Sequence, residues 1–496
     1  MRQLLLSFFL LATTLLHANK EAFVFTPKIV EAYHEIMALR LEKGNDLLKE
    51  EAKKNAKSPA LAFVSEYYYF LKSFINEDVQ EFDKEIEAFN KRLSIIRQGD
   101  QESPYYLYCQ AELLLHQAAM RFKFRDYLRG ANNVRDAYKL LEKNIQLYPK
   151  FSPQYKSMGM LQVLVGTVPD NYLWITDLLG MKGNIHDGMK KIESFRNAPF
   201  VNPETEMLKE EALFMYAFLQ LHIVKEKEEA WQVVEASTRN YSNNLLQCYV
   251  RAAIGLQCKK TDEVIRTLNQ RPKDKEYARF YFLEYMLGKA YLFKQDSSAQ
   301  IHFKTFVSFF KGKNYIKDAY RKLGWSYLCM GDEDKYHIYM GLVERYGQAD
   351  IDEDKQALLE AEKKDIPQPE ILRGRMYFDG GYYKEALNIL KSLENRKWDR
   401  EQDAIEYPYR LARVYDESNQ TDLAISYYKK TIAIGANAIW YFAANSSLHL
   451  GLIYEKEGKY DLAKQYFNKA MNFPNQEYTF GINQQAKSGL ERLKEK

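Results

Sequence analysis

The chain has 496 residues, more than one hydrophobic core usually serves, so we expect two or more domains or an array of repeats. Hydrophobic residues make up 46% and charged residues 28%, which is ordinary for a folded, soluble protein. The formal net charge of +4 is small and no run of Lys and Arg stands out, which excludes a global field that would draw the chain to nucleic acid or anionic lipid.

The first 18 residues have the features of a secretory signal. Arg2 precedes an apolar stretch from Leu4 to Leu16, and the small residue Ala18 stands where a signal peptidase would cut. We expect cleavage after Ala18 and export, to the periplasm or cell envelope of a bacterium. The apolar stretch is shorter than the roughly 20 residues of a membrane-spanning helix. An uncleaved membrane anchor is the alternative.

Residues 19–200 predict an irregular helical domain without a clean repeat. Apolar residues recur with helical spacing in SEYYYFLKSFI and in LYCQAELLLHQAAMRFKF. Pro104, Pro149 and Pro153 are expected to punctuate the helices.

Near residues 160–190 the helical pattern is interrupted by two turn signals, VPDN and MKGN, between apolar runs. One interpretation is a core element that breaks the array of helices, with Trp174 packed inside. The other is an apolar flap that meets lipid or a partner. The candidate flap residues are Leu173, Trp174, Ile175, Leu178 and Leu179.

The same segment is similar to part of a eukaryotic family that groups tetratricopeptide protein thirty-nine with the yeast inclusion-body-clearance protein. The match covers about 40 residues and rests on Gly166, Pro169, the phrase Leu-Leu-Gly-Met-Lys-Gly over residues 178–183, and Gly188-Met189. Met stands where that family tends to have Phe. The resemblance implies a helical-repeat scaffold with a lipid-associated role.

From about residue 250 onward a short motif returns at a nearly constant interval. Leu-Gly-x-x-Tyr at residues 287–291 reappears at 323–327, 36 residues later. A small residue at this phase recurs through the chain, as Ala252, Gly288, Gly324, Gly374, Ala412 and Gly451. Further downstream in each unit, a second small or apolar residue follows, as Ala299, Tyr336, Ala386, Ala424 and Ala463.

A glycine inside a helix costs about 1 kcal/mol relative to alanine. Its return at one phase therefore predicts the close approach of a second helix. Gly331, Gly381 and Gly458 stand where the first helix of each unit should end in a left-handed cap.

This pattern resembles the tetratricopeptide repeat (TPR) superfamily, whose repeats of roughly 34 residues fold as helix–turn–helix hairpins. The resemblance implies an all-α fold, an α-solenoid of stacked TPR hairpins with an irregular helical N-terminal half. We expect one TPR array over residues 201–348 and a second over 369–496. Because single hairpins cannot bury their apolar faces alone, neighbouring hairpins must stack.

Between the two arrays, residues 349–368 form an acidic insertion. We expect an extended, solvated linker that ends at Pro367 and Pro369. Asp350, Asp352 and Asp354 imitate the start of a calcium loop, but Lys355 replaces its glycine and Ala361 its final glutamate, which argues against calcium binding.

No catalytic motif is present: the sequence lacks HExxH, a P-loop, GxSxG and a strand-to-helix GxGxxG. The histidines are scattered, and no pair of the four cysteines forms CxxC. We read the cysteines as buried small hydrophobes. The sequence therefore predicts a non-enzymatic protein without a metal or cofactor.

The resemblance to TPR proteins implies that the first helices of the hairpins line a concave, partner-binding groove. Mapped onto this sequence by motif, the groove positions hold a mixture of cationic and aromatic side chains. They are Tyr285, Lys289, Arg321, Trp325, Arg375, Phe378, Tyr409 and Arg413. Arginine offers a planar fork for carboxylates, so a protein or peptide partner with an acidic segment would suit them. We expect the strongest contact at Arg375, Tyr409 and Arg413.

Two functional hypotheses follow. The first is an exported, non-enzymatic TPR scaffold that binds a protein or peptide partner through this groove. The alternative is a lipid- or membrane-associated repeat protein that acts through the apolar segment near residues 160–190.

Overall fold

The computed structural model describes residues 20–77, 79–168, 180–474 and 477–494. This part of the chain is helical and contains no β-strand, in agreement with the predicted all-α fold. The predicted secretory signal lies outside the described residues. None of the described helices is both long and apolar enough to cross a membrane.

The helices group into two compact units, which are described separately. The first unit consists of Met1–Cys258, Asp262–Leu283 and Phe309–Lys313, and the second of Lys259–Thr261, Glu284–Ser308 and Asn314–Lys496.

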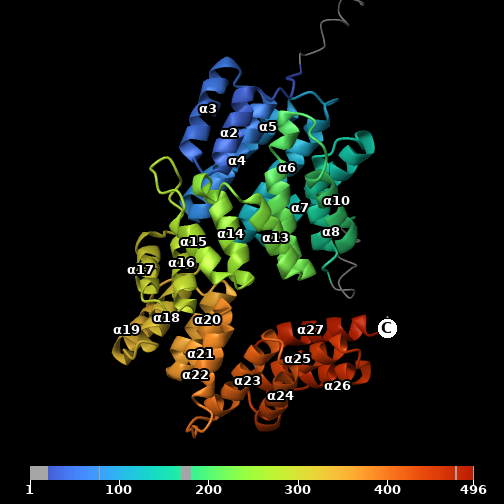
Figure 1. Cartoon of the computed structure of the whole chain (residues 1–496). Helices are drawn as coiled ribbons and strands as arrows, with labels where there is room; N and C mark the ends of the chain where they lie inside the picture. The colour runs from blue at the N-terminus through green and yellow to red at the C-terminus, as the bar shows by residue number, and fades with distance from the viewer. Residues whose placement is uncertain (1–19, 78, 169–179, 475–476, 495–496) are drawn as a thin grey trace, which may run out of the picture. The chain divides into compact units, whose positions relative to one another are not determined.

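The first unit runs from the blue to the green part of Figure 1. Its helices are α2 (Pro27–Met37), α3 (Leu41–Lys54), α4 (Pro59–Asn76), α5 (Val79–Arg97), α6 (Pro104–Lys123), α7 (Tyr127–Leu147), α8 (Gln154–Val165), α10 (Ile185–Arg196), α11 (Pro203–Glu206), α12 (Lys209–Leu219), the π-helical turn η2 (Gln220–Val224), α13 (Lys227–Ser237), the 3₁₀ turn η3 (Tyr241–Asn243), α14 (Leu245–Gln257) and α15 (Thr261–Asn269).

Three helices of this unit begin with the same local device, a hydroxyl residue followed by proline. The side chain of Ser58 accepts a hydrogen bond from the Leu61 amide at the start of α4, and Ser103 caps α6 in the same way. Thr26 caps α2. Proline suits the first helical position because its missing N–H would have no partner there. Pro104 therefore starts a helix, as the sequence indicates.

Helices α8 and α10 approach each other through two glycines. A Cβ atom added to Gly159 would lie 2.5 Å from the carbonyl oxygen of Gly188, and one added to Gly188 would lie 2.5 Å from the carbonyl oxygen of Gly159. Gly166 and Gly183 also stand too close to neighbouring backbone for any side chain. Gly166, Gly183 and Gly188, which belong to the segment that resembles the inclusion-body-clearance family, thus allow close helix packing.

The second unit runs from yellow to red in Figure 1. Its helices are α16 (Phe282–Phe293), α17 (Ser298–Phe309), α18 (Ile316–Leu328), α19 (Glu333–Arg345), α20 (Asp352–Lys363), α21 (Pro369–Gly380), α22 (Tyr383–Lys391), α23 (Glu401–Glu417), α24 (Thr421–Gly435), α25 (Phe442–Lys456), α26 (Tyr460–Ala470) and α27 (Thr479–Arg492). Apart from α20 and α27, they pack as consecutive helix–turn–helix hairpins.

The recurring small residues explain how each hairpin closes. A Cβ added to Gly451 in α25 would lie 2.5 Å from the ring of Phe467 in α26. The same relation joins Gly288 to Phe303 and Gly374 to Leu390. The predicted left-handed caps are confirmed, because Gly331, Gly381 and Gly458 have φ angles of +84°, +84° and +74°. The repeat pattern thus sets both the close approach of the two helices and the turn between them.

Replacing Gly451 by alanine is expected to lower the free energy of unfolding by about 2 kcal/mol, because the new methyl group overpacks the ring of Phe467. Gly341 is the matched control: it also lies inside a helix, α19, but nothing lies within 4 Å of its added Cβ. Gly341→Ala should therefore raise stability by up to about 1 kcal/mol. Urea denaturation measures both, and equal effects of the two substitutions would contradict the packing explanation.

The predicted extended linker is wrong, because residues 352–363 form helix α20. Its buried residues Asp354, Ala357 and Ala361 lie on one face. The Asp354 carboxylate accepts hydrogen bonds from the amides of Tyr315 (2.7 Å) and Asp318 (2.9 Å), at the start of α18. The acidic residues that suggested a solvated linker therefore begin a helix, where negative charge is favoured, and one of them caps the neighbouring helix. Burial raises the pKa of Asp354 to about 6.

The four cysteines are free thiols. Cys109 and Cys248 are buried, as expected, whereas Cys258 and Cys329 are half-buried. The described core therefore rests on helix packing.

Candidate partner-binding groove

The second unit contains a hollow of about 140 Å³, which we call the groove. It is formed by α18, α21, α23 and α25, the first helices of successive hairpins, together with α20 and the residues before α27. Its lining residues are Arg321, Trp325, Gln356, Leu359, Glu360, Lys363, Asp365, Pro367, Gln368, Ile371, Leu372, Arg375, Arg400, Gln402, Asp403, Glu406, Arg410, Tyr441, Phe442, Glu477 and Tyr478.

Helix α20 forms one wall of the groove and is held by polar contacts to α18. The Trp325 indole N–H donates to the Glu360 carboxylate at 2.6 Å, and the Arg321 guanidinium lies 3.5 Å from the same carboxylate. Gln356, Leu359 and Lys363 of α20 also line the groove. The repeat pattern does not predict α20 at this place, since its residues lie outside the repeat register. Only the helical spacing of Asp354, Ala357 and Ala361 could have revealed it.

Three of the predicted groove residues line this hollow: Arg321, Trp325 and Arg375. The Arg375 guanidinium lies over the Trp325 ring, 5.2 Å from its centroid, and that of Arg321 lies 4.6 Å from the same centroid. The Lys322 ammonium lies 5.5 Å from this centroid as well, so three cations share one indole in a favourable cation–π arrangement. Of the three, Arg375 is the most accessible, with a side chain 33% exposed.

The other predicted positions do not line the hollow. Tyr285, Phe378 and Tyr409 are buried, so their side chains are not accessible to a partner. The Tyr285 hydroxyl donates to Asp318 at 2.5 Å. Arg413 stacks on Phe378 at 5.0 Å and donates to the Tyr409 hydroxyl at 3.2 Å. Lys289 is half-buried near Phe293. Of the three residues expected to make the strongest contact, Arg375, Tyr409 and Arg413, only Arg375 therefore lines the hollow.

Residues 169–179 lie outside the described residues, and with them the candidate flap of Leu173, Trp174, Ile175, Leu178 and Leu179. Met181, which follows it, is buried.

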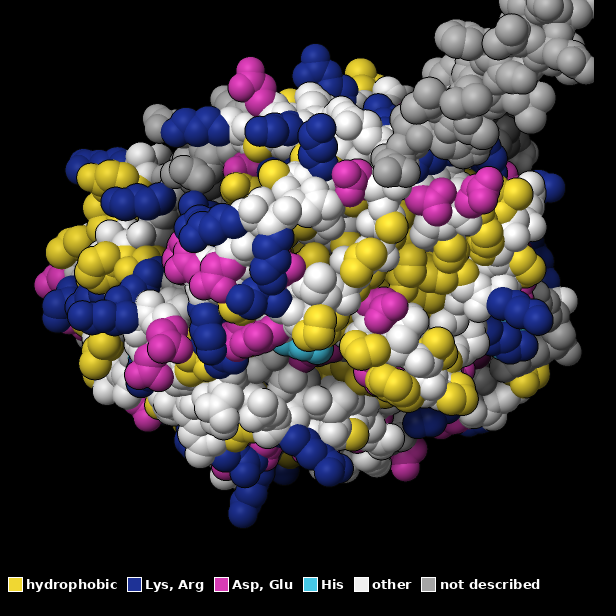
Figure 2. Space-filling model, turned by 90° about the horizontal axis from the view of Figure 1, so that it is seen from above, with side chains coloured by type: hydrophobic (Ala, Val, Ile, Leu, Met, Phe, Trp, Pro, Cys, Tyr) yellow, Lys and Arg dark blue, Asp and Glu magenta, His cyan; other side chains and the backbone are white. Residues whose placement is uncertain are grey.

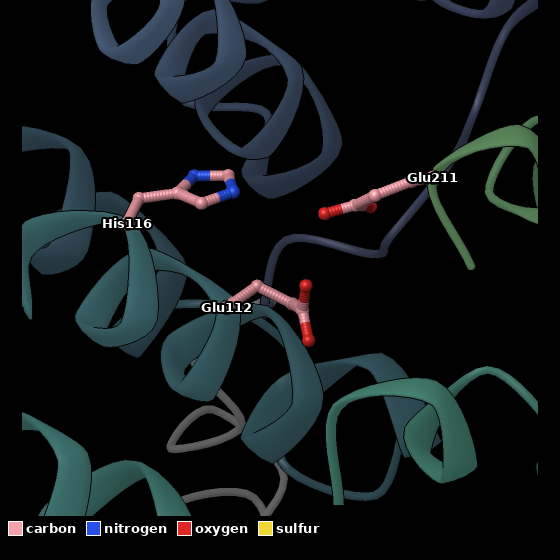
Figure 3. Close-up of side chains that lie close together, drawn as sticks. All are labelled: Glu112, His116 and Glu211. Carbon is pink, nitrogen blue, oxygen red and sulfur yellow. The ribbon is translucent and has the colours of Figure 1, made fainter. Parts of the chain in front are cut away.

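A second group of functional residue types lies in the core of the first unit. Glu112 and His116 stand one turn apart on α6, and their side chains point toward Glu211 of α12 (Figure 3). One ligand atom from each residue lies within 4.8 Å of the other two, a spacing that a metal ion could bridge. The sequence offered only half of this arrangement, the i, i+4 spacing of Glu112 and His116.

The residues around this group do not fit a metal ion, because Lys156 of α8 supplies the cation. Its ammonium is fully buried and makes an ion pair with Glu112, another with Glu211 at 3.1 Å, and a contact with the Ser157 hydroxyl at 3.1 Å. These partners use its three donors. Burial alone would lower the pKa of Lys156, but the two carboxylates outweigh burial and raise it.

His116 stays neutral at pH 7, since burial lowers its pKa to about 4. Its ring stacks on Phe70 at 4.4 Å and meets the Tyr67 ring edge-on at 4.6 Å. The Tyr67 hydroxyl in turn donates to Glu211 at 3.1 Å. The group thus ties together α4, α6, α8 and α12 and is a structural ion cluster.

Comparison with known proteins finds that residues 405–434 and 444–475 match the family model of the tetratricopeptide repeat; these ranges overlap the hairpins α23–α24 and α25–α26. No curated protein matches the sequence. Among solved structures, the crystal structure of the APC/C hetero-tetramer Cut9-Hcn1 is similar at 11% identity, covering 94% of this chain and 100% of that chain, with a TM-score of 0.24.

Proposed function

We propose that this tetratricopeptide-repeat protein is a non-enzymatic scaffold that binds a segment of a protein partner in the groove of its second unit. TPR hairpins generally mediate protein–protein interaction. The observation that carries the proposal is Arg375, a cation held at the groove surface on the Trp325 ring. Its nearest carboxylate, that of Asp379, lies 3.8 Å away, beyond hydrogen-bonding distance.

A carboxylate of the partner is the group that Arg375 would bind. A guanidinium presents two parallel N–H donors that match the two oxygens of a carboxylate. Leu359 and Tyr478, each 48% exposed, supply apolar surface in the same hollow. An acidic side chain with an apolar neighbour would satisfy both features of the groove.

We expect recognition to be local, because the formal net charge of the chain is only +4. Figure 2 shows Lys and Arg side chains next to Asp and Glu side chains over much of the face in view. This mixture accords with the net charge of +4. A partner would therefore be selected by the groove and not by long-range attraction.

The test is in-cell crosslinking of tagged protein in its native host, followed by mass spectrometry of the captured species. Arg375→Glu should lose a protein that the unaltered chain enriches, because it places like charges at the contact. Arg413 is left unaltered, because it packs on Phe378 and its exchange could act through loss of folding. Lys464→Glu, which reverses an exposed charge on α26, is the matched control and should capture the partner normally.

Equal capture by Arg375→Glu and the control would contradict a binding site in the groove. Capture of lipid alone would favour the candidate flap near residues 160–190. We further propose that the protein acts after export, on the strength of its N-terminal signal features. N-terminal sequencing of the native protein would then begin at Asn19.

A further inference from the structure

The charges that line the groove balance one another. Five are cationic and five are anionic: Arg321, Lys363, Arg375, Arg400 and Arg410 against Glu360, Asp365, Asp403, Glu406 and Glu477. A groove of this kind does not attract a run of acidic residues as a purely cationic groove would.

Four of the cations already have anionic partners inside the groove. Their ion pairs are Arg321–Glu360 at 3.5 Å, Lys363–Glu477 at 2.8 Å, Arg400–Asp403 at 3.6 Å and Arg410–Glu406 at 2.6 Å. The fifth cation, Arg375, and the fifth anion, Asp365, are left over. Among the described residues, the Asp365 carboxylate makes no ion pair, and its side chain is exposed.

The Asp403 carboxylate stands near two other anionic side chains of the lining, those of Glu406 and Asp365. The Asp403 carboxylate is buried and has Arg400 as its ion-pair partner at 3.6 Å. Burial raises the pKa of Asp403, and the negative charges of Glu406 and Asp365 raise it further, against the effects of Arg400 and Arg396. An additional cation beside Asp365 and Asp403 would relieve this accumulation of negative charge.

We infer that the groove recognises a partner segment of mixed charge, in which an acidic side chain binds Arg375 and a basic side chain binds Asp365, with apolar residues between them. The apolar residues would lie against Leu359 and Tyr478, which line the same hollow and are each 48% exposed. This inference rests on the proposed function and specifies the partner's chemistry.

The test uses fluorescent peptides of five to seven residues with blocked ends and the purified protein, with binding measured by fluorescence anisotropy. Gly-Glu-Leu-Leu-Lys-Gly is compared with versions that carry Glu or Lys at both charged positions, and each is made with one to three leucines. An exposed ion pair is worth up to about 1 kcal/mol, or about fivefold in Kd. The mixed peptide should therefore bind about fivefold more tightly than either uniform peptide.

Charge reversal in the groove should change this preference in a defined direction. Arg375→Glu should prefer the doubly basic peptide, and Asp365→Lys the doubly acidic one. Asp352→Lys is the control for the second variant, because Asp352 is 93% exposed on α20 and lies outside the groove lining. It should keep the preference of the unaltered protein. Both groove positions are accessible, and circular dichroism checks that each variant folds.

Equal binding of the mixed and doubly acidic peptides, or an unchanged preference in Asp365→Lys, would overturn the inference, as would the absence of binding by every peptide. If Arg375→Glu still abolishes partner capture in cells, the scaffold function stands and only the mixed-charge rule fails. If capture also survives Arg375→Glu, both fail.

Discussion

Replacing Lys156 by methionine should lower the free energy of unfolding by about 3–5 kcal/mol, as is usual when one partner of a buried ion pair is removed. The substitution leaves the carboxylates of Glu112 and Glu211 facing each other without their shared cation. Methionine fills a similar volume, so the loss reports charge and not a cavity. Urea denaturation followed by circular dichroism measures the change.

The pH dependence identifies the cause of this loss. In Lys156→Met, burial raises the pKa of Glu112 without opposition from the lysine. The folded state then binds more protons than the unfolded state, so the deficit should shrink as the pH falls from 8 to 5. Glu112→Gln/Lys156→Met should also recover part of the loss. Lys190→Met, on the exposed face of α10, is the control and should stay within about 0.5 kcal/mol of the unaltered protein. A deficit independent of pH would contradict the charge explanation.

Replacing Asp318 by asparagine should produce a loss of similar size, about 3–5 kcal/mol, in the second unit. Its carboxylate is fully buried, pairs with Arg321 and Lys322, and accepts a hydrogen bond from Tyr285. Burial alone would raise the pKa of Asp318, but the two cations outweigh burial and lower it. The substitution keeps the shape and leaves both cations without this partner.

The pH dependence of Asp318→Asn should run in the opposite direction. Burial lowers the pKa of Lys322 to about 8 even with Asp318 present, and it should fall further in the variant. The unfolded state then binds more protons than the folded state, so the deficit should shrink as the pH rises from 7 to 9. Asp352→Asn, which changes an exposed carboxylate on α20, should leave stability unchanged. A deficit that grows over this range would argue against uncompensated cations as the cause.

The repeat region was predictable from sequence because successive hairpins use the same contact, a small residue of the first helix against a large side chain of the second. The glycine that faces Phe467 in one hairpin has counterparts facing Phe303 and Leu390, so their common phase was visible in the sequence. The first unit offered no such signal. Its helices meet through contacts that occur once, such as the crossing of Gly159 with Gly188, and only the fold brings their partners together.

The sequence predicted which face of the helices forms the groove, but not which residues on that face are accessible. The repeat register identified Arg321, Trp325 and Arg375, which line the hollow, together with Tyr285 and Tyr409, which are buried and do not line it. The repeat register predicts the direction in which a side chain leaves its helix. It does not predict whether a neighbouring helix covers that side chain. The wall formed by α20 was missed because its acidic residues and the prolines that follow were read as a solvated linker.

Site-specific photo-crosslinking tests partner binding in the groove most directly. A photoreactive amino acid would replace Leu359, which is 48% exposed on the α20 wall, or, as the control, Ile338, which is 61% exposed on α19 outside the groove lining. We expect that the Leu359 probe crosslinks one protein in cells, that the Ile338 probe does not, and that Arg375→Glu abolishes the crosslink. Crosslinking of the same protein from both positions, or from Leu359 regardless of Arg375→Glu, would contradict partner binding in the groove.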